Sequence, residues 1–498
     1  MTTNFPPTLL CDFYKVSHRE QYPAGTEYVY STWVPRGSRI PEITEVVAFG
    51  MQAFVQKYLV DYFNDNFFNR SLESVLDEYE RVIKYTLGVE DPDSSHIKSL
   101  WELGYLPLEI KALHEGTLVP LRVPIATVEN TLPEFFWLTN YIETLFSVEN
   151  WMATTSATHA WQYRKILTKW AKKTGGDLAA VPFQGHDFSM RGMSSVESAA
   201  ASGAGHLLSF TGTDTIPSII FAEKYYGANI EKELIGASIP ATEHSVMCAY
   251  GQDELSSYGR IINDIYPGGF VSIVSDTWDL WKVLAETIPQ LKEDILKRDG
   301  RVVIRPDSGD PVEIICGSAI SFGVGKTPSE KGVVEVLWDT FGGTVNEKGY
   351  KVLDPHIGAI YGDSITESRC EAMCVRLAAK GFASTNIVLG IGSFTYQYNT
   401  RDTFAFAMKS TAVTIDGVEH AIFKDPATDD GTKKSLTGRV IVSYNEQTKK
   451  YAVTDGLTKQ DVSNNAWKDS LRVIFRNGQS FNTLKFSEVR EALLERLE

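Results

Sequence analysis

The segment IRPDSGDP (304–311) places Arg305 and Asp307 directly after an apolar run of strand type. The guanidinium of arginine is a planar fork of donors that fits the oxygens of a phosphate or pyrophosphate. A carboxylate two residues later could accept hydrogen bonds from the vicinal hydroxyls of a ribose. The same pair could instead cap the end of a strand, and this segment alone leaves both roles open.

Three further segments carry chemistry of this kind. In HDFSMRG, Phe188 and Arg191 stand three residues apart, so an aromatic face could stack on a flat ring while a guanidinium binds an anion. In GTDT, Asp214 lies in a tight turn, and in ATEHS, His244 follows a possible strand, GASIP. Taken singly, each favours a structural role: a helix-start ion pair with a core phenylalanine, a turn aspartate and a structural histidine.

Other patterns fail on inspection. GVGKT (323–327) would need a glycine at Ile320 to be a phosphate loop, and GIGSFT (390–395) has Thr395 where a dinucleotide fingerprint needs its third glycine. The nine histidines form no HxxxH or HxH pair, and the five cysteines show no zinc-ligand spacing. No GxSxG nucleophile elbow occurs. The sequence therefore predicts neither a metal site nor a hydrolase of that type.

The elements that must position these residues recur through the middle of the chain. Apolar β-type runs end in Gly, Asp or Ser, in the segments GFVSIVSD, RVVIRPDSG, IGAIYGDS and NIVLGIGS. Residues 277–300 predict a helix closed by Gly300, and ITESRCEAMCVRLAAKG predicts another closed by Gly381. This order predicts parallel βα units, whose loops after the strands share one mouth. Four residues are expected to converge there: Asp276, Asp307, Asp363 and Ser393.

The flanking segments differ in pattern from the middle. Residues 105–130 predict short strands with turns, residues 439–455 alternate as a β-hairpin would, and FSEVREALLERLE predicts a closing helix. The prediction is an α/β protein with a central βα barrel at 161–399. A second α/β domain is expected from both chain ends, residues 1–160 together with 400–498.

The chain has 498 residues and a net charge of −15, which argues against a non-specific nucleic-acid binder. Basic residues nevertheless gather in one stretch, at Arg401, Lys409, Lys424, Lys433, Lys434 and Arg439. Charge alone favours a solvated face there over an anion site. The sequence shows no secretory signal, no run of 18 apolar residues and no lipidation motif, so a cytoplasmic protein without a membrane span is expected.

Read in order, the motifs resemble the nicotinamide phosphoribosyltransferase family. The matching phrases run from about residue 9 to residue 440: LLCDFYKVSHREQYP, VENTLPEFFWLTNYIET, HDFSMRGMSS, GTDT, ATEHS, VSDTWD, IRPDSGDP, GDS, TRD and FKDP. The resemblance implies the type II phosphoribosyltransferase fold, an irregular βα barrel with an α/β domain. It also implies a homodimer whose active sites are shared between subunits, with nicotinamide, phosphoribosyl pyrophosphate and ATP as substrates.

The resemblance assigns roles to individual residues. Phe188 would stack on the nicotinamide ring, and Tyr14, with Asp12 nearby, would close the other face from the partner subunit. Arg191, Arg305 and His244 would line the phosphate region, while Asp307 would hold the ribose hydroxyls. The remaining substrate-binding residues implied are Ser275, Gly362, Asp363, Gly392, Ser393 and Arg401, with Lys409, Lys424 and Lys433 or Lys434 contributing charge across the dimer. Mg²⁺ would accompany the pyrophosphate, because its hard oxygens suit that ion.

Two residues narrow the expected activity. Asp214 matches the family's amide-reading aspartate, which accepts from an amide NH₂ and repels the carboxylate of nicotinate. His244 matches the histidine that ATP phosphorylates in this family, and Asp279 in SDTWD is expected to orient its imidazole. The alternatives are a nicotinate phosphoribosyltransferase, a non-catalytic binding protein on the same fold and an unrelated βα-barrel hydrolase.

The sequence departs from the family in two places. Ser393 and Phe394 stand where mammalian members have a run of glycines in the loop after the last barrel strand. The hydroxyl of Ser393 could donate to a phosphate, while Phe394 could narrow the loop. Near 432–434 the lysine-rich segment carries a shift of about one residue, which leaves the choice between Lys433 and Lys434 open.

Overall fold

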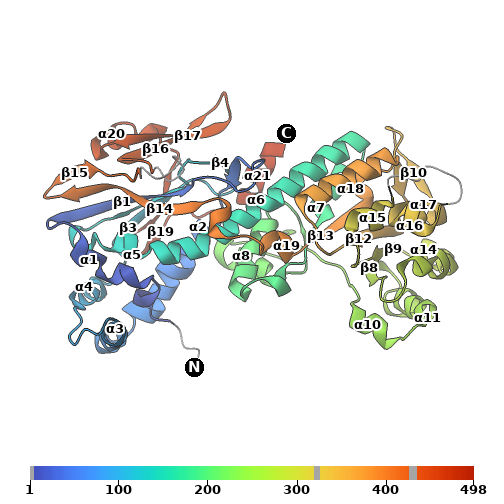
Figure 1. Ribbon diagram of the computed structural model, residues 1–498, viewed down its shortest axis with the longest axis horizontal. Helices are drawn as coiled ribbons and strands as arrows, with labels where there is room; N and C mark the ends of the chain where they lie inside the picture. The colour runs from blue at the N-terminus through green and yellow to red at the C-terminus, as the bar shows by residue number, and fades with distance from the viewer. Residues whose placement is uncertain (1–4, 319–325, 426–434, 498) are drawn as a thin grey trace. The chain divides into compact units, whose positions relative to one another are not determined.

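A computed structural model describes residues 5–318, 326–425 and 435–497 (Figure 1). The chain divides into two compact units. Unit 1 comprises Met1–Thr158, Phe221–Ala228 and Asn399–Arg496, and unit 2 comprises His159–Ile220, Asn229–Tyr398 and Leu497–Glu498. The domain bounds expected from the sequence, near 160 and 400, stay a prediction, and they did not include the assignment of Phe221–Ala228 to unit 1. Each unit is described by itself.

Unit 2 is built on a parallel sheet of six strands. In sheet order they are β7 (Gly212–Thr213), β6 (Gly185–Asp187), β13 (Ile387–Ile391), β12 (Ile357–Tyr361), β9 (Gly300–Arg305) and β8 (Gly269–Val274). Hydrophobic residues fill these strands because both faces of a parallel sheet are covered. Val271, Ile273, Val302 and Ile304, for example, are fully buried.

A short irregular segment joins the two outer strands of this sheet. Ala237 bridges Gly212 of β7, and Ala241 bridges Ser272 of β8, both in parallel fashion. Backbone hydrogen bonds from Ala237 to the oxygen of Thr211 (2.7 Å) and from Ser272 to the oxygen of Pro240 (2.9 Å) accompany the bridges. The hydrogen-bonded ring is therefore closed, and the predicted βα barrel is confirmed, with GASIP supplying part of its wall.

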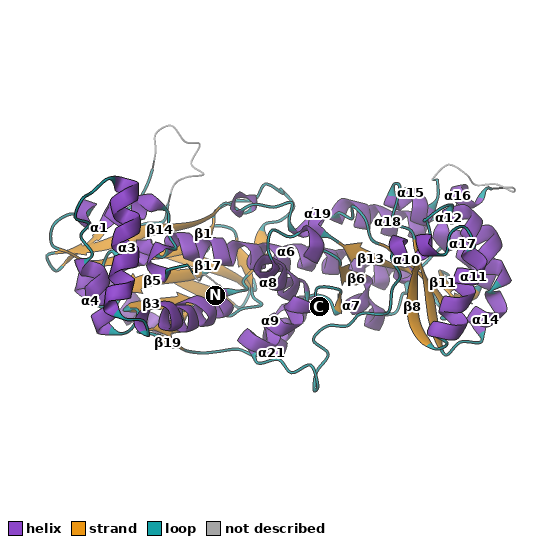
Figure 2. Ribbon diagram, turned by 90° about the horizontal axis from the view of Figure 1, so that it is seen from below, coloured by secondary structure: helices purple, strands orange, loops and turns teal. Residues whose placement is uncertain are grey.

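Helices surround the strands of unit 2 (Figure 2). They are α7 (Val181–Gln184), α8 (Val196–His206), α10 (His244–Ala249), α11 (Glu254–Gly259), α12 (Leu280–Lys282), α13 (Ile288–Gln290), α14 (Lys292–Leu296), α15 (Pro311–Cys316), α16 (Pro328–Lys331), α17 (Val333–Phe341), α18 (Glu367–Ala379) and α19 (Ser393–Tyr396). A hairpin, β10 (Gly343–Val345) and β11 (Lys351–Leu353), precedes β12. Two more helices, α6 (Glu143–Thr174) and α9 (Ile216–Tyr226), have residues in both units.

The two helices predicted between barrel strands fare differently. Helix α18 ends as expected, with Gly381 at φ +77° after the last turn. The helix expected over 277–300 is confirmed in part, because helical residues extend from Leu280 to Leu296. They form several short segments, with a π-helical turn at Val283–Thr287 and a break at Leu291. Gly300 begins β9 instead of capping a helix.

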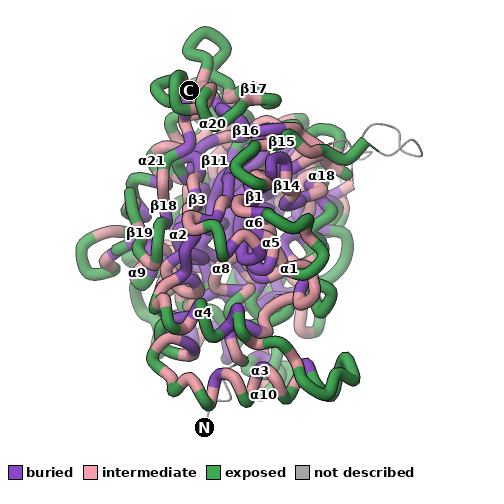
Figure 3. The backbone as a smooth tube through the Cα atoms, turned by 90° about the vertical axis from the view of Figure 1, so that its left-hand side faces the viewer, coloured by how far each residue is buried: buried purple, intermediate pink, exposed green. Residues whose placement is uncertain are grey.

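Unit 1 contains an antiparallel sheet of seven strands. In sheet order they are β15 (Val418–Ala421), β14 (Phe406–Ile415), β1 (Thr26–Pro35), β5 (Ala126–Asn130), β3 (Leu108–Ala112), β18 (Arg472–Arg476) and β19 (Gln479–Ser480). Figure 3 shows β1, β3 and β14 running through the buried part of the chain, whereas β17 (Lys450–Leu457) is mostly exposed.

Smaller pairs and helices complete unit 1. The pairs are β2 (Glu45–Val47) with β4 (Leu118–Pro120), and β16 (Arg439–Asn445) with β17. The helices are α1 (His18–Gln21), α2 (Met51–Phe54), α3 (Leu72–Leu87), α4 (Ser95–Leu103), α5 (Leu138–Tyr141), α20 (Lys459–Asn464) and α21 (Phe486–Leu494). The predicted strands in 105–130, the hairpin at 439–455 and the closing helix are confirmed. Within the described residues, no helix combines the length and apolarity that crossing a membrane requires.

Candidate active site

The polar residues predicted at the barrel mouth lie at the carboxyl ends of the strands of unit 2. Because parallel strands all end on the same rim, residues far apart in sequence meet there. Asp214 follows β7, Asp276 follows β8 and Asp307 follows β9. Gly362 and Asp363 follow β12, and Gly392 and Ser393 follow β13.

Asp276 is the most connected side chain of this rim. One carboxylate oxygen, Oδ2, accepts hydrogen bonds from the backbone N–H of Asp307 (2.8 Å) and from the hydroxyl of Ser308 (2.6 Å). The other, Oδ1, lies 3.3 Å from Nε2 of His244. The Asp276 side chain is only 6% exposed, so it has little freedom to leave these partners. It therefore ties the loop after β9, which carries Asp307, to the loop after β8 and to His244.

The partner predicted for His244 was wrong by three residues. The structure places Asp276, not Asp279, beside the imidazole. Asp279 is the N-cap of α12, where its Oδ1 accepts from the backbone N–H groups of Trp281 (3.0 Å) and Lys282 (3.1 Å). Capping satisfies donors that a helix start leaves unpaired, and it turns this carboxylate toward its own helix.

Ser275 holds the loop after β8 in place through buried hydrogen bonds. Its hydroxyl donates to the oxygen of Ile273 (2.7 Å) and accepts from the buried hydroxyl of Tyr258 (2.8 Å). Its backbone N–H donates to the oxygen of Arg305 (3.0 Å), which continues the pairing of β8 with β9 past the strand ends. Ser275 is fully buried, so its contacts position the loop that carries Asp276.

A cavity of about 240 Å³ lies within the barrel. Its lining is largely apolar, with the polar or charged side chains of His186, Asp214, Ser238, Ser272, Arg301 and Arg305. Phe188 lines it as well, and the guanidinium of Arg305 stands 5.8 Å from the centre of the Phe188 ring. A mostly apolar pocket with a few convergent polar groups is the usual form of a small-molecule site.

Two glycines make room for the Phe188 ring. A Cβ at Gly390 would stand 2.3 Å from that ring, and a Cβ at Gly362 would stand 3.0 Å from it and 3.1 Å from a carboxylate oxygen of Asp307. Both positions therefore require glycine for close packing, which places Gly362 between Phe188 and Asp307.

Asp214 is held by two side chains that the sequence did not single out. Its Oδ1 lies 2.8 Å from Nε2 of His186 and accepts from the hydroxyl of Ser238 at 2.5 Å. Burial alone would raise the pKa of Asp214, but the hydrogen bonds from His186 and Ser238 and the charge of Arg305 bring it below its ordinary value. The alternation of β6 could have indicated His186, because it lies two residues before Phe188 and so on the same face.

The loop around Ser393 and Phe394, where the sequence departs from the family, lies close to the turn that carries Arg191. Arg191 lies in a 3-10 turn, Met190–Gly192, and is exposed. Ser393 begins α19 and packs so closely on Gly192 that a Cβ there would be 2.1 Å from its hydroxyl. Phe394 is half exposed and stacks on Tyr398, with ring centres 5.4 Å apart. Asp363 is exposed and accepts from the hydroxyl of Ser364 (2.8 Å).

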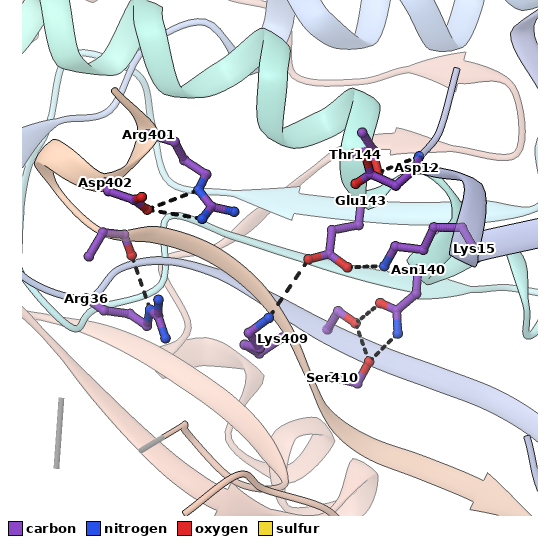
Figure 4. A network of polar contacts seen from close by, with 12 residues as sticks. Asp12, Lys15, Arg36, Asn140, Glu143, Thr144, Arg401, Asp402, Lys409 and Ser410 are labelled. Atoms are coloured by element: carbon purple, nitrogen blue, oxygen red, sulfur yellow. Dashed lines mark hydrogen bonds and ion pairs between the residues drawn. The ribbon is translucent and has the colours of Figure 1, made fainter. Parts of the chain in front are cut away.

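The remaining predicted residues lie in unit 1, where basic side chains gather around Glu143 at the start of α6 (Figure 4). Glu143 forms an ion pair with Lys15 and lies 4.0 Å from the ammonium of Lys409. Arg401 pairs with Asp402 (3.0 Å). We call Lys15, Arg36, Arg401, Lys409 and Lys424 the basic cluster. Burial lowers the pKa of Lys409, Glu143 raises it, and the charges of Arg36, Lys15 and Lys424 lower it further.

Asp12 and Tyr14 precede this cluster in the chain. Asp12 accepts from the hydroxyl of Thr144 at 2.9 Å, and its backbone N–H donates to the same hydroxyl at 3.1 Å (Figure 4). Tyr14 is 57% exposed, and its ring packs edge-on to His18. Lys424 is exposed, while Lys433 and Lys434 lie outside the described residues.

Comparisons with known proteins agree on the family. A model of the nicotinate phosphoribosyltransferase (NAPRTase) family matches residues 183–479, and a model of the nicotinamide phosphoribosyltransferase N-terminal domain matches residues 8–81. The chain is 48% identical to the nicotinamide phosphoribosyltransferase of Acinetobacter baylyi, over 100% of this chain and 99% of that one. It is 36% identical to the protein of the same name from Mycoplasma pneumoniae, over 88% and 96%.

Solved structures share the fold at low sequence identity. A nicotinate-nucleotide pyrophosphorylase from Pyrococcus furiosus aligns with a TM-score of 0.58 at 14% identity, covering 100% of this chain and 97% of that one. Human nicotinic acid phosphoribosyltransferase aligns with a TM-score of 0.52 at 14% identity, covering 98% and 93%. These two confirm the type II phosphoribosyltransferase fold, and the sequence matches show that the chain belongs to the nicotinamide phosphoribosyltransferases, an enzyme group within the NAPRTase family.

Proposed function

We propose that the protein transfers the phosphoribosyl group of phosphoribosyl pyrophosphate to the ring nitrogen of nicotinamide, with nicotinamide mononucleotide and pyrophosphate as products. The observation that carries this proposal is the anionic Asp214 in the wall of the barrel cavity, beside Phe188 and Arg305. A carboxylate accepts hydrogen bonds from a carboxamide and repels a second carboxylate, so this wall favours nicotinamide over nicotinate.

The rim residues support the chemistry of the transfer. Departure of pyrophosphate leaves positive charge on the ribose, so the enzyme must align the reacting atoms and neutralise the leaving group. In the proposal, Asp307 binds the ribose hydroxyls, and its backbone is already fixed by Asp276. Arg305 and Arg191 bind the pyrophosphate, and Gly362, Asp363, Gly392 and Ser393 receive the phosphate or the ribose.

Mg²⁺ belongs to the substrate in this proposal. Within the described residues, no group of three or more His, Cys, Asp or Glu side chains is placed to hold a metal ion. Mg²⁺ keeps several waters and needs few protein ligands when phosphate oxygens are available. It would therefore arrive on the oxygens of phosphoribosyl pyrophosphate and neutralise part of the leaving group.

Coupling to ATP is proposed through His244. The imidazole is 46% exposed, and its Nε2 faces Asp276, so a proton shared there leaves the lone pair on Nδ1. Attack of Nδ1 on the γ-phosphorus of ATP forms the N–P bond, and ADP departs with the electrons of the broken P–O bond. Asp276 is the positioning residue in this step.

The basic cluster of unit 1 fits a shared active site in a homodimer. Lys409, Lys424 and Arg401, with Lys433 or Lys434, would bind phosphate oxygens in the partner's barrel. Tyr14, with Asp12 beside it, would cover the nicotinamide ring there. Sedimentation with and without the two substrates, followed by mixing of Lys409→Met and Asp307→Ala subunits, tests this. Restored activity in the mixture supports shared sites, and none in a mixed dimer contradicts them.

The test of the main proposal compares the two pyridines directly. Purified protein receives phosphoribosyl pyrophosphate and Mg²⁺ with nicotinamide or nicotinate, with and without ATP, while label from γ-labelled ATP is followed on His244. We expect a higher kcat/KM for nicotinamide, label that disappears in His244→Ala, and a weaker preference in Asp214→Ser. The name of the matched family model makes nicotinate the second candidate, and equal or better use of nicotinate would decide for it.

A further inference from the structure

Three separate parts of the barrel wall meet at one oxygen of Asp214. His186 comes from β6, Asp214 follows β7, and Ser238 lies in the segment that closes the ring between β7 and β8. In the described part of the chain, the hydrogen bonds to the Asp214 side chain both fall on Oδ1. All three side chains line the barrel cavity, so the contacts are made at the surface that a ligand would meet.

The two donors fix the direction of the carboxylate. Donors at 2.8 Å and 2.5 Å on one oxygen leave the second, Oδ2, to accept from a bound molecule. A hydrogen bond to an ionised group is about twice as strong as a neutral one, so two of them resist rotation of the side chain. They also favour the ionised form of the carboxylate in a wall where burial opposes it.

The His186 ring and the backbone that carries Ser238 are both held in place. The His186 side chain is 11% exposed, and its ring lies against Phe188 with centres 4.9 Å apart. A Cβ at Gly212 would stand 2.8 Å from Nδ1 of the same ring. Ser238 follows Ala237, whose N–H and carbonyl both pair with the strand segment at Thr211 and Thr213. The carboxylate is therefore held by a packed ring and by a hydroxyl on a backbone segment that is itself paired with the barrel wall.

We infer that His186 and Ser238 are positioning residues that set the preference of this enzyme for a carboxamide over a carboxylate, by holding Asp214 ionised with Oδ2 directed at the ligand. This inference rests on the proposed function and names the side chains behind its selectivity. Without the two donors, Asp214 can rotate or take up a proton. A protonated Asp214 donates a hydrogen bond to the carboxylate of nicotinate instead of repelling it.

The experiment measures kcat/KM for nicotinamide and for nicotinate in wild type, Ser238→Ala, Ser238→Thr, His186→Leu and His186→Gln. We expect the ratio of the two values to fall about tenfold in Ser238→Ala and at least as much in His186→Leu, as loss of a charge-assisted hydrogen bond implies. Ser238→Thr keeps a hydroxyl and His186→Gln keeps an N–H donor, so each should restore part of the ratio. Ser329→Ala, an exposed change on α16, is the matched control.

The outcomes separate the inference from the proposed function. If wild type does not prefer nicotinamide, the proposed function fails. If wild type prefers nicotinamide and the ratio stays within twofold in both Ser238→Ala and His186→Leu, the positioning role is overturned. A purely structural role would lower both kcat/KM values together and leave the ratio unchanged, which also contradicts the inference. Thermal unfolding of each variant shows whether it folds. If His186→Leu does not fold, the ratio measured for Ser238→Ala alone decides whether the positioning role holds.

Discussion

The barrel rim of unit 2 and the basic cluster of unit 1 hold their charges in different ways. On the rim, Asp214 and Asp276 each accept two hydrogen bonds from groups on neighbouring strands and loops, so their oxygens have fixed directions. In the basic cluster, Lys15 and Lys409 share the single carboxylate of Glu143, and only Lys15 is deeply buried. The rim is organised before any substrate binds, whereas Lys409 has room to follow one.

This difference suits two kinds of recognition. Distinguishing an amide from a carboxylate depends on the position and charge of one oxygen, which rigid hydrogen bonding provides. Binding a phosphate depends mainly on positive charge nearby, and flexible lysine side chains deliver that as point charges. Substitutions at the organising carboxylates of the two regions, Asp276 and Glu143, should therefore have different consequences.

The largest effect is expected on the rim, at Asp276. Asp276→Ala removes the acceptor of the Asp307 N–H, the acceptor of the Ser308 hydroxyl and the partner of His244. Because a displacement of about 1 Å at a reacting group can cost about 10²-fold, we expect kcat/KM for nicotinamide to fall about 10²-fold even without ATP. Steady-state kinetics with and without ATP measure this loss, and label on His244 should fall as well.

Asp276→Asn is the informative companion variant. Its amide oxygen can still accept from the Asp307 N–H, so part of the activity without ATP should return, while a neutral amide no longer stabilises a charged imidazole. If Asp276→Ala keeps kcat/KM within threefold of wild type, the rim does not depend on this carboxylate, and the contrast between the two regions is lost.

The second-largest effect is expected in unit 1, at Glu143, and it is mainly a loss of stability. Glu143→Gln leaves the ammonium of Lys15, whose side chain is 4% exposed, without its counter-ion. Removing one partner of a buried ion pair costs about 3–5 kcal/mol, and the partial exposure of Glu143 puts this case near the lower end. Denaturant unfolding should show a loss of about 3 kcal/mol. Glu149 lies on the same helix as Glu143 and pairs with Lys57, which is more exposed than Lys15. Glu149→Gln should therefore cost about 1 kcal/mol or less.

The same variant should change the pH dependence of substrate binding. The pKa of Lys409 lies below its ordinary value of 10.5 because of burial, and Glu143 is the group that opposes this lowering. Without Glu143 the pKa of Lys409 falls further, so its charge is lost at a lower pH as the solution becomes alkaline. The KM for phosphoribosyl pyrophosphate should therefore begin to rise at lower pH in Glu143→Gln than in wild type. Identical pH profiles would contradict a phosphate-binding role for Lys409.

The sequence predicts which residues lie on the barrel rim better than it predicts the contacts among them. Apolar runs that end in Gly, Asp or Ser identified the strands and the mouth, because burial on both faces and the turn after each strand leave a strong local pattern. The choice between Asp276 and Asp279 left no such pattern, since both carboxylates lie within one short motif. Only the start of α12 decides which of them is used as a cap.

Long-range pairing explains the other omissions. The sequence predicts GASIP as a possible strand, but it does not show that the bridges of Ala237 and Ala241 join this segment to β7 and β8. His186 and Ser238 meet Asp214 across 28 and 24 residues of chain, a pairing that composition and spacing do not reveal. Likewise, Lys15 and Glu143 lie 128 residues apart. In each case the missing information is the partner, not the residue type.

The smallest effect is expected at Asp279 and completes the comparison with Asp276. Asp279→Ala removes an N-cap whose Oδ1 accepts two backbone hydrogen bonds, a loss that typically costs about 1 kcal/mol of stability. Because the carboxylate is directed at its own helix, kcat/KM and the label on His244 should stay within about twofold of wild type. Thermal unfolding and the labelling assay measure the two quantities in one preparation. Strong loss of label with unchanged stability would instead return the orienting role to Asp279, and it would mean that the loop after β8 rearranges when ATP binds.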